Sequence, residues 1–149
     1  MIKGLIFDLD GTLINSLYDL ASSTNRVLKS NNLNTHELEK YNYFIGNGVK
    51  KLIQRAIEPH NELFDKCLDE FYEDYNNHCL DDTYIYEGIE ELIDSLYHEG
   101  YKLAVVTNKP HHIAVKIVNE LFKDKFIVVY GQHQPYPTKP DNTLVYKAL

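Results

Sequence analysis

The decisive stretch of sequence is residues 4–12, which read GLIFDLDGT. An apolar run typical of a buried strand leads directly into two carboxylates, Asp8 and Asp10, spaced i, i+2. Side chains alternate along an extended segment, so both carboxylates are expected to point the same way at the carboxyl end of the strand. Open α/β sheets bind their ligands at that end. The pair predicts a site where one carboxylate attacks an electrophile and the other moves a proton, and it also suits a divalent cation.

A hairpin turn is the competing interpretation of the Asp-Gly pair at residues 10–11. It would require a second alternating strand immediately after the turn. Instead, Leu13 and Ile14 lead to Asn15-Ser16, which is a helix-start signal, and then into a long helical pattern. The sequence therefore favours the chemical interpretation of the two carboxylates over the turn.

The composition is that of a globular protein of one domain, or of one domain with an insertion. The chain has 149 residues, 44% apolar and 25% charged, with a net charge of −7. This negative charge argues against a nucleic-acid or anionic-membrane surface, so no such partner is expected. No apolar run is long enough to span a bilayer and no signal peptide precedes Asp8, which predicts a cytoplasmic protein. Cys67 and Cys79 fit no zinc or disulfide spacing and are expected as buried thiols on one helix.

Hydrophobic spacing predicts a long helical region between strands of an α/β pattern. Three strands are expected, over residues 2–7, 103–107 and 126–130. Helices are expected over residues 16–31, 36–44, 49–57 and 61–80, and later over residues 89–99, 110–122 and 141–149. Tyr41, Tyr72, Tyr75 and Tyr97 fall on apolar helix faces and are predicted to belong to the core.

Strands that alternate with helices imply right-handed crossovers and a parallel sheet. The predicted fold is therefore α/β, with a Rossmann-like parallel sheet core formed by residues 1–14 and 84–149. An all-helical domain, residues 15–83, is inserted after the first strand. The two segments that join these parts, near residues 14–16 and 81–84, are expected to form a hinge.

Three further polar residues follow the later strands of the predicted sheet. Thr107 and Asn108 lie at the end of the second strand, where a hydroxyl and an amide can donate hydrogen bonds to an anion. Ordinary helix capping before Pro110 is the alternative for these two residues. Lys139 lies between two prolines after the third strand, where a restrained backbone helps to aim its charge, although a solvated surface lysine has the same sequence.

The combination is more specific than any of its parts. The chain resembles the haloacid dehalogenase-like (HAD) phosphatase superfamily in the order of three motifs. These are Asp-x-Asp-Gly-Thr, then a strand that ends in Thr-Asn, and then Lys-Pro-Asp. Residues 4–21 and the segment IGNGV at residues 45–49 look like its phosphoglycolate phosphatase branch. The resemblance covers nearly the whole chain and implies that the helical insertion is a cap domain.

The resemblance implies a phosphatase that hydrolyses a small phosphomonoester, similar to phosphoglycolate, through an aspartyl-phosphate. Asp8 then resembles the nucleophile and Asp10 the general acid and base. Thr107, with Asn108 beside it, resembles the phosphate-binding residue, and Lys139 the lysine that stabilises charge. Mg²⁺ is the implied cofactor, held by the Asp8 carboxylate and the Asp10 backbone carbonyl.

The loop Gly46-Asn47-Gly48 has two interpretations. It can be a flexible turn between two helices of the insertion, or the family's cap loop that contributes to substrate choice. In the second case its glycines would let backbone N–H groups approach a small anion closely. The substrate remains open at this point, because pyrophosphate and nucleoside monophosphates fit the same motifs. A sugar-phosphate phosphomutase and a catalytically inactive fragment are the two alternative functions.

The chain departs from the family pattern at its C-terminal side. The resemblance implies a further strand, with a Gly-Asp motif that supplies acidic metal ligands, beside the strand that carries Asp8. The sequence has no such segment after Lys139, so the predicted core is incomplete and its first strand lies at a sheet edge. Either the chain is a fragment of a longer phosphatase, or another chain completes the edge by self-association.

Overall fold

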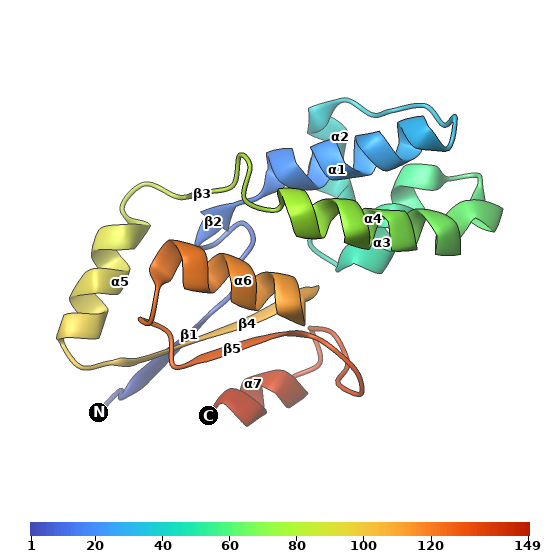
Figure 1. The fold of residues 1–149 in the computed structure, drawn as a ribbon. Helices are drawn as coiled ribbons and strands as arrows, with labels where there is room; N and C mark the ends of the chain where they lie inside the picture. Colours follow the sequence, from blue (N-terminus) through green and yellow to red (C-terminus); the bar gives the residue numbers. More distant parts are fainter. The chain divides into compact units, whose positions relative to one another are not determined.

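The computed structural model describes residues 1–149, which divide into two compact units. The α/β unit comprises Met1–Asn15 and Tyr84–Leu149, and the helical unit comprises Ser16–Thr83. Figure 1 labels the helices and strands of both units. None of the helices combines the length and the apolar composition that a bilayer crossing requires.

A three-stranded parallel sheet forms the centre of the α/β unit. Its strands are β1 (Gly4–Phe7), β4 (Lys102–Pro110) and β5 (Val128–Gln132), in the order β1-β4-β5. Both pairings are parallel, with Phe7 opposite Val105 and Ala104 opposite Val128. The predicted α/β fold with a parallel sheet is confirmed, and β1 lies at one edge of the sheet.

The central strand is the most buried part of the sheet. Leu103, Ala104, Val105 and Val106 are all 5% exposed or less, because a strand between two neighbours is covered on both faces. Helix α6 (His111–Phe122) packs against β4 and β5, and α7 (Thr143–Ala148) also contacts both strands. In Figure 1 these two helices lie on opposite faces of the sheet, while α5 (Ile89–His98) precedes β4.

The boundaries of all three sheet strands differ from the prediction by a few residues. Strand β1 begins at Gly4, not at residue 2, and β5 begins at Val128, two residues later than expected. Strand β4 continues to Pro110, three residues beyond the predicted end, with an irregular register against β5 after Val106. The polar segment before Pro110 stays extended because a residue that precedes proline disfavours helical dihedrals.

A short antiparallel ribbon was missed by the sequence analysis. Strand β2 (Ile14–Asn15) pairs with β3 (Tyr84–Ile85), so the two segments that leave and re-enter the α/β unit run side by side. Two residues are too few to show the alternation that predicts a strand. The Asn15 amide also donates a hydrogen bond to the Tyr84 hydroxyl at 3.1 Å.

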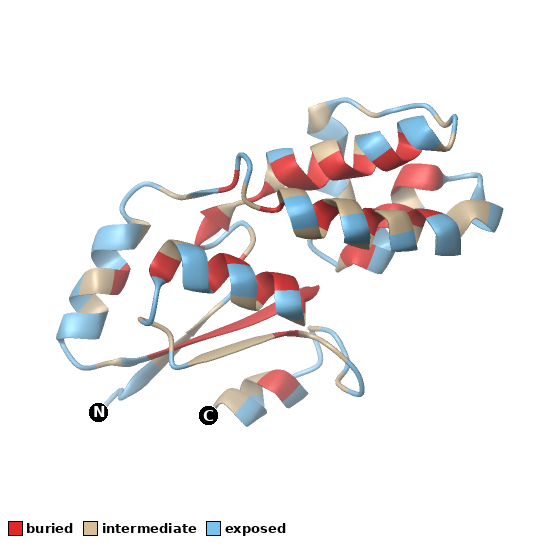
Figure 2. Cartoon of the chain, viewed as in Figure 1, coloured by how far each residue is buried: buried red, intermediate tan, exposed pale blue.

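The helical unit consists of four α-helices and one 3₁₀ turn. These are α1 (Leu17–Ser30), α2 (Leu38–Phe44), α3 (Val49–Ile57), the turn Asn61–Leu63 and α4 (Phe64–His78). Figure 2 shows buried and exposed positions alternating along these helices, as amphipathic helices require. Phe71, Tyr75 and Cys67 of α4 are fully buried, and Leu28 of α1 is also buried.

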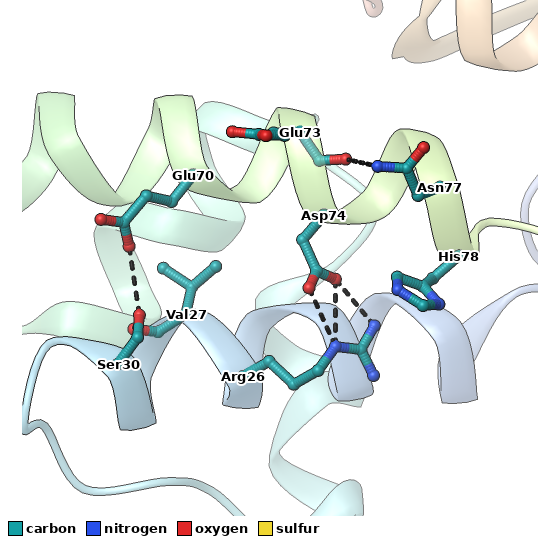
Figure 3. A pocket seen from close by; sticks show the side chains of 8 residues that line it. All are labelled: Arg26, Val27, Ser30, Glu70, Glu73, Asp74, Asn77 and His78. Atoms are coloured by element: carbon teal, nitrogen blue, oxygen red, sulfur yellow. Dashed lines mark hydrogen bonds and ion pairs between the residues drawn. The ribbon is translucent and has the colours of Figure 1, made fainter.

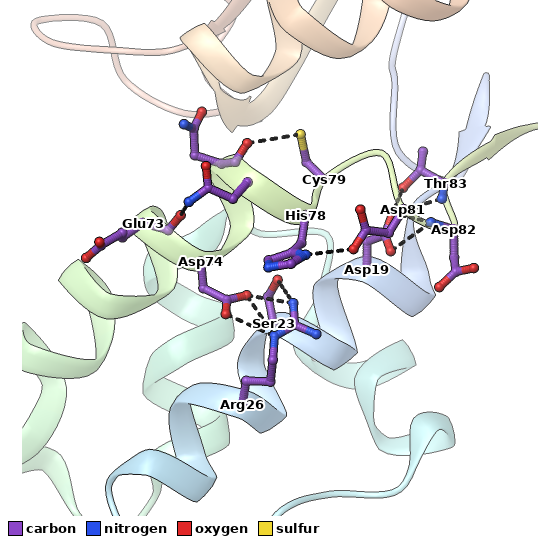
Figure 4. A network of polar contacts seen from close by, with 12 residues as sticks. Asp19, Ser23, Arg26, Glu73, Asp74, His78, Cys79, Asp81, Asp82 and Thr83 are labelled. Carbon is purple, nitrogen blue, oxygen red and sulfur yellow. Dashed lines mark hydrogen bonds and ion pairs between the residues drawn. The ribbon is translucent and has the colours of Figure 1, made fainter.

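Polar contacts join α1 to α4 and to the segment that follows it. The buried Asp19 carboxylate accepts hydrogen bonds from the N–H groups of Asp82 and Thr83 and from the Thr83 hydroxyl, at 2.7–3.0 Å (Figure 4). Further along the helices, the Arg26 guanidinium binds both oxygens of Asp74. The Asp74 carboxylate raises the pKa of Arg26.

An open groove of about 530 Å³ lies between α1 and α4 (Figure 3). Charged and polar side chains line most of it, and the lining residues are Arg26, Val27, Ser30, Glu70, Glu73, Asp74, Asn77 and His78. None of the residues predicted to carry chemistry belongs to this groove. Its ion pair and hydrogen bonds link two helices of the same unit, which is a structural role.

Candidate active site

Asp8 directly follows β1, and its carboxylate is accessible. The side chain is 46% exposed, and its Oδ1 lies 3.0 Å from the Lys139 Nζ atom. The same oxygen accepts a hydrogen bond from the Leu9 N–H at 2.8 Å. A carboxylate with a defined cation on one side and solvent on the other can approach an electrophile that enters from solvent.

A tight turn fixes the backbone around the two carboxylates. The carbonyl of Leu9 accepts hydrogen bonds from the N–H groups of Leu13 and Ile14. Leu9 and Leu13 are fully buried, and Gly11 provides a positive φ of 78° that a side chain would strain. The sequence Asp-Gly-Thr therefore builds the turn, and its buried leucines anchor the turn to the core.

Asp10 is held by a lysine that the sequence analysis did not select. The Nζ atom of Lys109 donates to Asp10 Oδ1 at 2.9 Å, and the Lys109 side chain is only 2% exposed. The Asp10 side chain is 23% exposed. Lys109 lies two residues after Thr107 and directly before Pro110, in the stretch expected to be a loop, so spacing alone gave no reason to place it beside Asp10.

Thr107 and Lys139 lie close to this pair through β4. Thr107 is 2% exposed, and its hydroxyl oxygen accepts a hydrogen bond from the Lys109 N–H at 3.1 Å, which leaves its hydrogen to donate. The Lys139 Nζ atom donates to the carbonyl of Val106 at 3.0 Å as well as facing Asp8. Two lysines and two aspartates therefore gather at the carboxyl end of β1 and along the last residues of β4.

The Asn108 amide forms two hydrogen bonds with the backbone of Lys139. Its Oδ1 accepts a hydrogen bond from the Lys139 N–H at 2.6 Å, and its Nδ2 donates to the Lys139 carbonyl at 3.2 Å. Asn108 thus fixes the backbone of Lys139, 31 residues further along the chain. This pair of hydrogen bonds explains how the lysine loop is aligned with the end of β4.

The Gly46-Asn47-Gly48 segment connects α2 to α3 in the helical unit. Gly46 and Gly48 have φ values of 103° and 89°, a region that favours glycine. The Arg55 guanidinium donates to Asn47 Oδ1 at 3.1 Å and to the carbonyl of Phe44 at 3.2 Å. The loop is thus held in place by a side chain of α3 and is more than an unsupported turn.

The acidic side chains of the site are two, Asp8 and Asp10. No group of three or more histidine, cysteine, aspartate and glutamate side chains is arranged to hold a metal ion. Hard oxygen atoms of one or two carboxylates, completed by water and phosphate oxygens, are the usual protein contribution to a magnesium site. Asp8 and the Asp10 backbone therefore offer hard oxygen donors, without a cluster of acidic side chains around them.

Comparison with known proteins identifies the family of this chain. The model of the haloacid dehalogenase-like hydrolase family matches residues 5–149. The chain belongs to this family. As a haloacid dehalogenase-like hydrolase, it carries the Asp-x-Asp-Gly-Thr motif at the position where the structure places the accessible carboxylate.

The most informative relatives are named phosphoglycolate phosphatases. The protein from Colwellia psychrerythraea is 38% identical over 115 residues, which are 71% of this chain and 50% of that protein. The protein from Nitrosospira multiformis is 33% identical over 148 residues, which are 94% of this chain and 65% of that protein. This haloacid dehalogenase-like chain therefore spans between half and two-thirds of the length of these two curated relatives.

A solved structure shows the same fold. The crystal structure of a predicted phosphoglycolate phosphatase from Haemophilus somnus 129pt matches with a TM-score of 0.90 and 33% sequence identity. The match covers 98% of this chain and 69% of that chain. Both units of the haloacid dehalogenase-like chain therefore have counterparts in a solved member of the family.

Proposed function

We propose that this chain is a phosphatase that hydrolyses a small phosphomonoester similar to phosphoglycolate. The main observation in support of this proposal is the accessible Asp8 carboxylate beside Lys139. Asp10 lies two residues further along the same turn. The names of the curated relatives support the substrate class. Since the chain spans only part of their length, both activity and substrate belong to the proposal.

In the first half-reaction, an Asp8 carboxylate oxygen attacks the phosphorus atom in line with the ester bond. An acyl phosphate bond forms on Asp8, and the bond from phosphorus to the ester oxygen breaks. Asp10 gives a proton to the departing alkoxide, which leaves as an alcohol. The two carboxylates lie beside different lysines, Asp8 beside Lys139 and Asp10 beside Lys109.

In the second half-reaction, water attacks the phosphorus atom of the acyl phosphate. Asp10 takes a proton from that water, and the bond between phosphorus and Asp8 breaks to release inorganic phosphate. The Asp8 carboxylate is regenerated and Asp10 is again protonated. The sum is the hydrolysis of one phosphomonoester to an alcohol and phosphate, with no other reactant.

Lys139 and Thr107 stabilise the phosphoryl oxygens during both steps. The Lys139 ammonium faces Asp8 at 3.0 Å, so a phosphoryl group transferred to Asp8 comes within its reach. The Thr107 hydroxyl has a hydrogen to donate, and its buried position keeps it fixed. Prearranged donors of this kind stabilise charge that develops in the transition state. Asn108 supports Lys139 through the backbone, and it stays a proposed phosphate-binding residue beside Thr107.

Magnesium fits the donors that the site offers. The Asp8 carboxylate and the Asp10 backbone carbonyl would hold the ion, with water and a phosphate oxygen completing its shell. When bound, Mg²⁺ supplies positive charge that offsets the repulsion between the Asp8 carboxylate and an anionic phosphate ester.

The helical unit is proposed as the cap domain of the enzyme. Its Gly46-Asn47-Gly48 loop, held by Arg55, presents the backbone of two glycines with few side-chain atoms around it. Such a segment can bring N–H groups close to the carboxylate of a small substrate. In this proposal the cap loop selects the substrate, and the α/β unit performs the chemistry.

The test is the release of inorganic phosphate from phosphoglycolate and from 4-nitrophenyl phosphate, with Mg²⁺ and with EDTA. We expect Mg²⁺-dependent release that Asp8→Asn abolishes, because an amide cannot act as the nucleophile. Asp124→Asn, at an exposed position of the same unit, is the matched control and should retain full activity.

Release that survives Asp8→Asn, or no release by the wild-type chain, would contradict the proposal. Conversion of a sugar phosphate into an isomer without release of phosphate would identify the phosphomutase alternative.

A further inference from the structure

The two lysines of the site differ sharply in their surroundings. Lys139 is 26% exposed and faces an Asp8 side chain that is 46% exposed. Lys109 is 2% exposed and faces an Asp10 side chain that is 23% exposed. A buried ammonium group is unfavourable unless a counter-charge compensates it, so Lys109 and Asp10 depend on one another more strongly than the outer pair does.

The backbone of Lys109 is fixed on two sides. Its N–H donates to the Thr107 hydroxyl at 3.1 Å. Gly131 of β5 approaches so closely that an added Cβ atom would lie 2.6 Å from the Lys109 carbonyl oxygen. Pro110 follows directly and restricts the backbone dihedrals of Lys109. Because the main chain of Lys109 is fixed, its side chain extends toward Asp10 from a fixed Cα position.

The geometry points to Lys109 as a positioning residue that acts through Asp10. It holds the Asp10 carboxylate in one place and leaves Lys139 to Asp8 and the transferred phosphoryl group. This inference rests on the proposed function, in which Asp10 exchanges a proton in both half-reactions. Without the Lys109 ammonium, we expect the Asp10 carboxylate to shift, so that the proton donor leaves its position.

The leaving group of the substrate provides the decisive readout. An alkyl phosphate such as phosphoglycolate needs a proton on its departing oxygen, whereas 2,4-dinitrophenyl phosphate releases a stable anion without one. The value of kcat/KM reports the steps up to that departure, and positioned acid–base groups contribute about 10²–10⁴-fold. Lys109→Met should therefore lower kcat/KM for phosphoglycolate by roughly 100-fold, and for the dinitrophenyl ester by less than about tenfold.

Two variants control for nonspecific damage. Lys109→Arg keeps the charge and should recover part of the activity on phosphoglycolate. Lys102→Met removes an exposed lysine at the other end of β4 and should leave both substrates unaffected. Equal losses on both substrates with Lys109→Met would show a purely structural role and overturn the inference.

A double variant tests whether Lys109 acts through Asp10. If it does, adding Lys109→Met to Asp10→Asn should cause no further loss on phosphoglycolate, because the group that Lys109 positions is already gone. A further loss as large as that of Lys109→Met alone would contradict the inference.

The failure of this inference can be distinguished from the failure of the proposed function. Crystal structures of wild type and Lys109→Met, which need no activity, should show the Asp10 carboxylate displaced in the variant. If the variant does not fold, Lys109→Gln, which keeps a hydrogen-bond donor on a shorter side chain, takes its place in the same comparison. An Asp10 carboxylate in an unchanged position would overturn the positioning role even if the wild-type chain hydrolysed no phosphate ester.

Discussion

The helical unit and the α/β unit bury their apolar side chains in different ways. In the helical unit, α1, α3 and α4 each contribute several buried side chains to a shared interior. In the α/β unit, β4 is buried almost throughout, whereas β1 has no buried residue. The candidate site draws on both strands of the α/β unit. Asp8 follows the poorly buried β1, whereas Thr107 and Lys109 lie on the well-buried β4. The fold thus places the accessible Asp8 carboxylate at the edge of the sheet, and the buried Thr107 and Lys109 on its central strand.

The largest effect is expected from Phe71→Ala in the helical unit. Phe71 is fully buried and stacks on Tyr75 with ring centroids 5.2 Å apart, so truncation should cost about 3–5 kcal/mol of unfolding free energy. Phe7→Ala on β1 is the matched change in the α/β unit. Because Phe7 is only partly buried, it should cost roughly half as much. Urea unfolding of both variants measures the difference, and equal costs would remove the distinction between the two units.

Asp19→Ala should cause the next largest loss of unfolding free energy. It removes the acceptor for two backbone N–H groups and one hydroxyl at the end of the helical unit, at a cost of about 3 kcal/mol. Asp81→Ala removes a nearby carboxylate that pairs with His78 at an exposed position and should cost less than about 1 kcal/mol. Thermal unfolding distinguishes the two changes. A negligible effect of Asp19→Ala would mean that other groups fix the segment at Asp82 and Thr83.

The two edge strands allow a sharper comparison within the α/β unit. An added Cβ atom at Gly131 of β5 would lie 2.5 Å from the His111 Cα atom. Gly131→Ala should therefore lower the unfolding free energy by about 2 kcal/mol. At Gly4 of β1 the nearest atom is the Lys102 carbonyl oxygen at 3.1 Å, and Gly4→Ala should cost less than about 1 kcal/mol. Denaturant midpoints of the two variants check this order. The reverse order would show that β1 is the more tightly packed edge.

The smallest effect is a pH dependence at the start of α6. Burial lowers the pKa of His111, and the positive charges of His133, His112 and Lys147 lower it further. The neutral His111 ring accepts a hydrogen bond from the Gly131 N–H at Nδ1, which a protonated ring cannot do. Its contribution to stability is complete above the ordinary pKa of about 6.5 and is lost as the pH falls through the lowered value.

His111→Asn serves as the matched variant, since its Oδ1 remains an acceptor without titrating. Unfolding free energies between pH 7.5 and 5 should fall more steeply for wild type than for this variant. Parallel curves would show that His111 does not contribute to the pH dependence.

Much of the fold could be predicted because its signals are local. Apolar spacing gave all four helices of the helical unit and the three strands of the sheet, with errors of a few residues at strand ends. Cys67 and Tyr75 are buried as predicted. Tyr97 is 47% exposed, so its assignment to the core was wrong. Ile93 of the same helix α5 is fully buried, so Tyr97 lies outside the part of the helix that is covered.

The long-range contacts of the site could not be predicted in the same way. Lys109 and Asp10 are 99 residues apart, and nothing in the local pattern around either residue selects the other. The same holds for Asn108 and the Lys139 backbone. The β2–β3 ribbon is too short for a periodic signal. The motifs indicate which residue types the site contains, whereas the pairing between them emerges only from the folded chain.

The most direct test of the account is to trap the covalent intermediate. Borohydride reduces an acyl phosphate to an alcohol, so it converts a phosphorylated aspartate into homoserine that peptide mass spectrometry can locate. We expect homoserine at residue 8 only when phosphoglycolate and Mg²⁺ are both present, and none in Asp8→Asn. Release of phosphate without modification of residue 8, or modification at another aspartate, would contradict the assignment of Asp8 as the nucleophile.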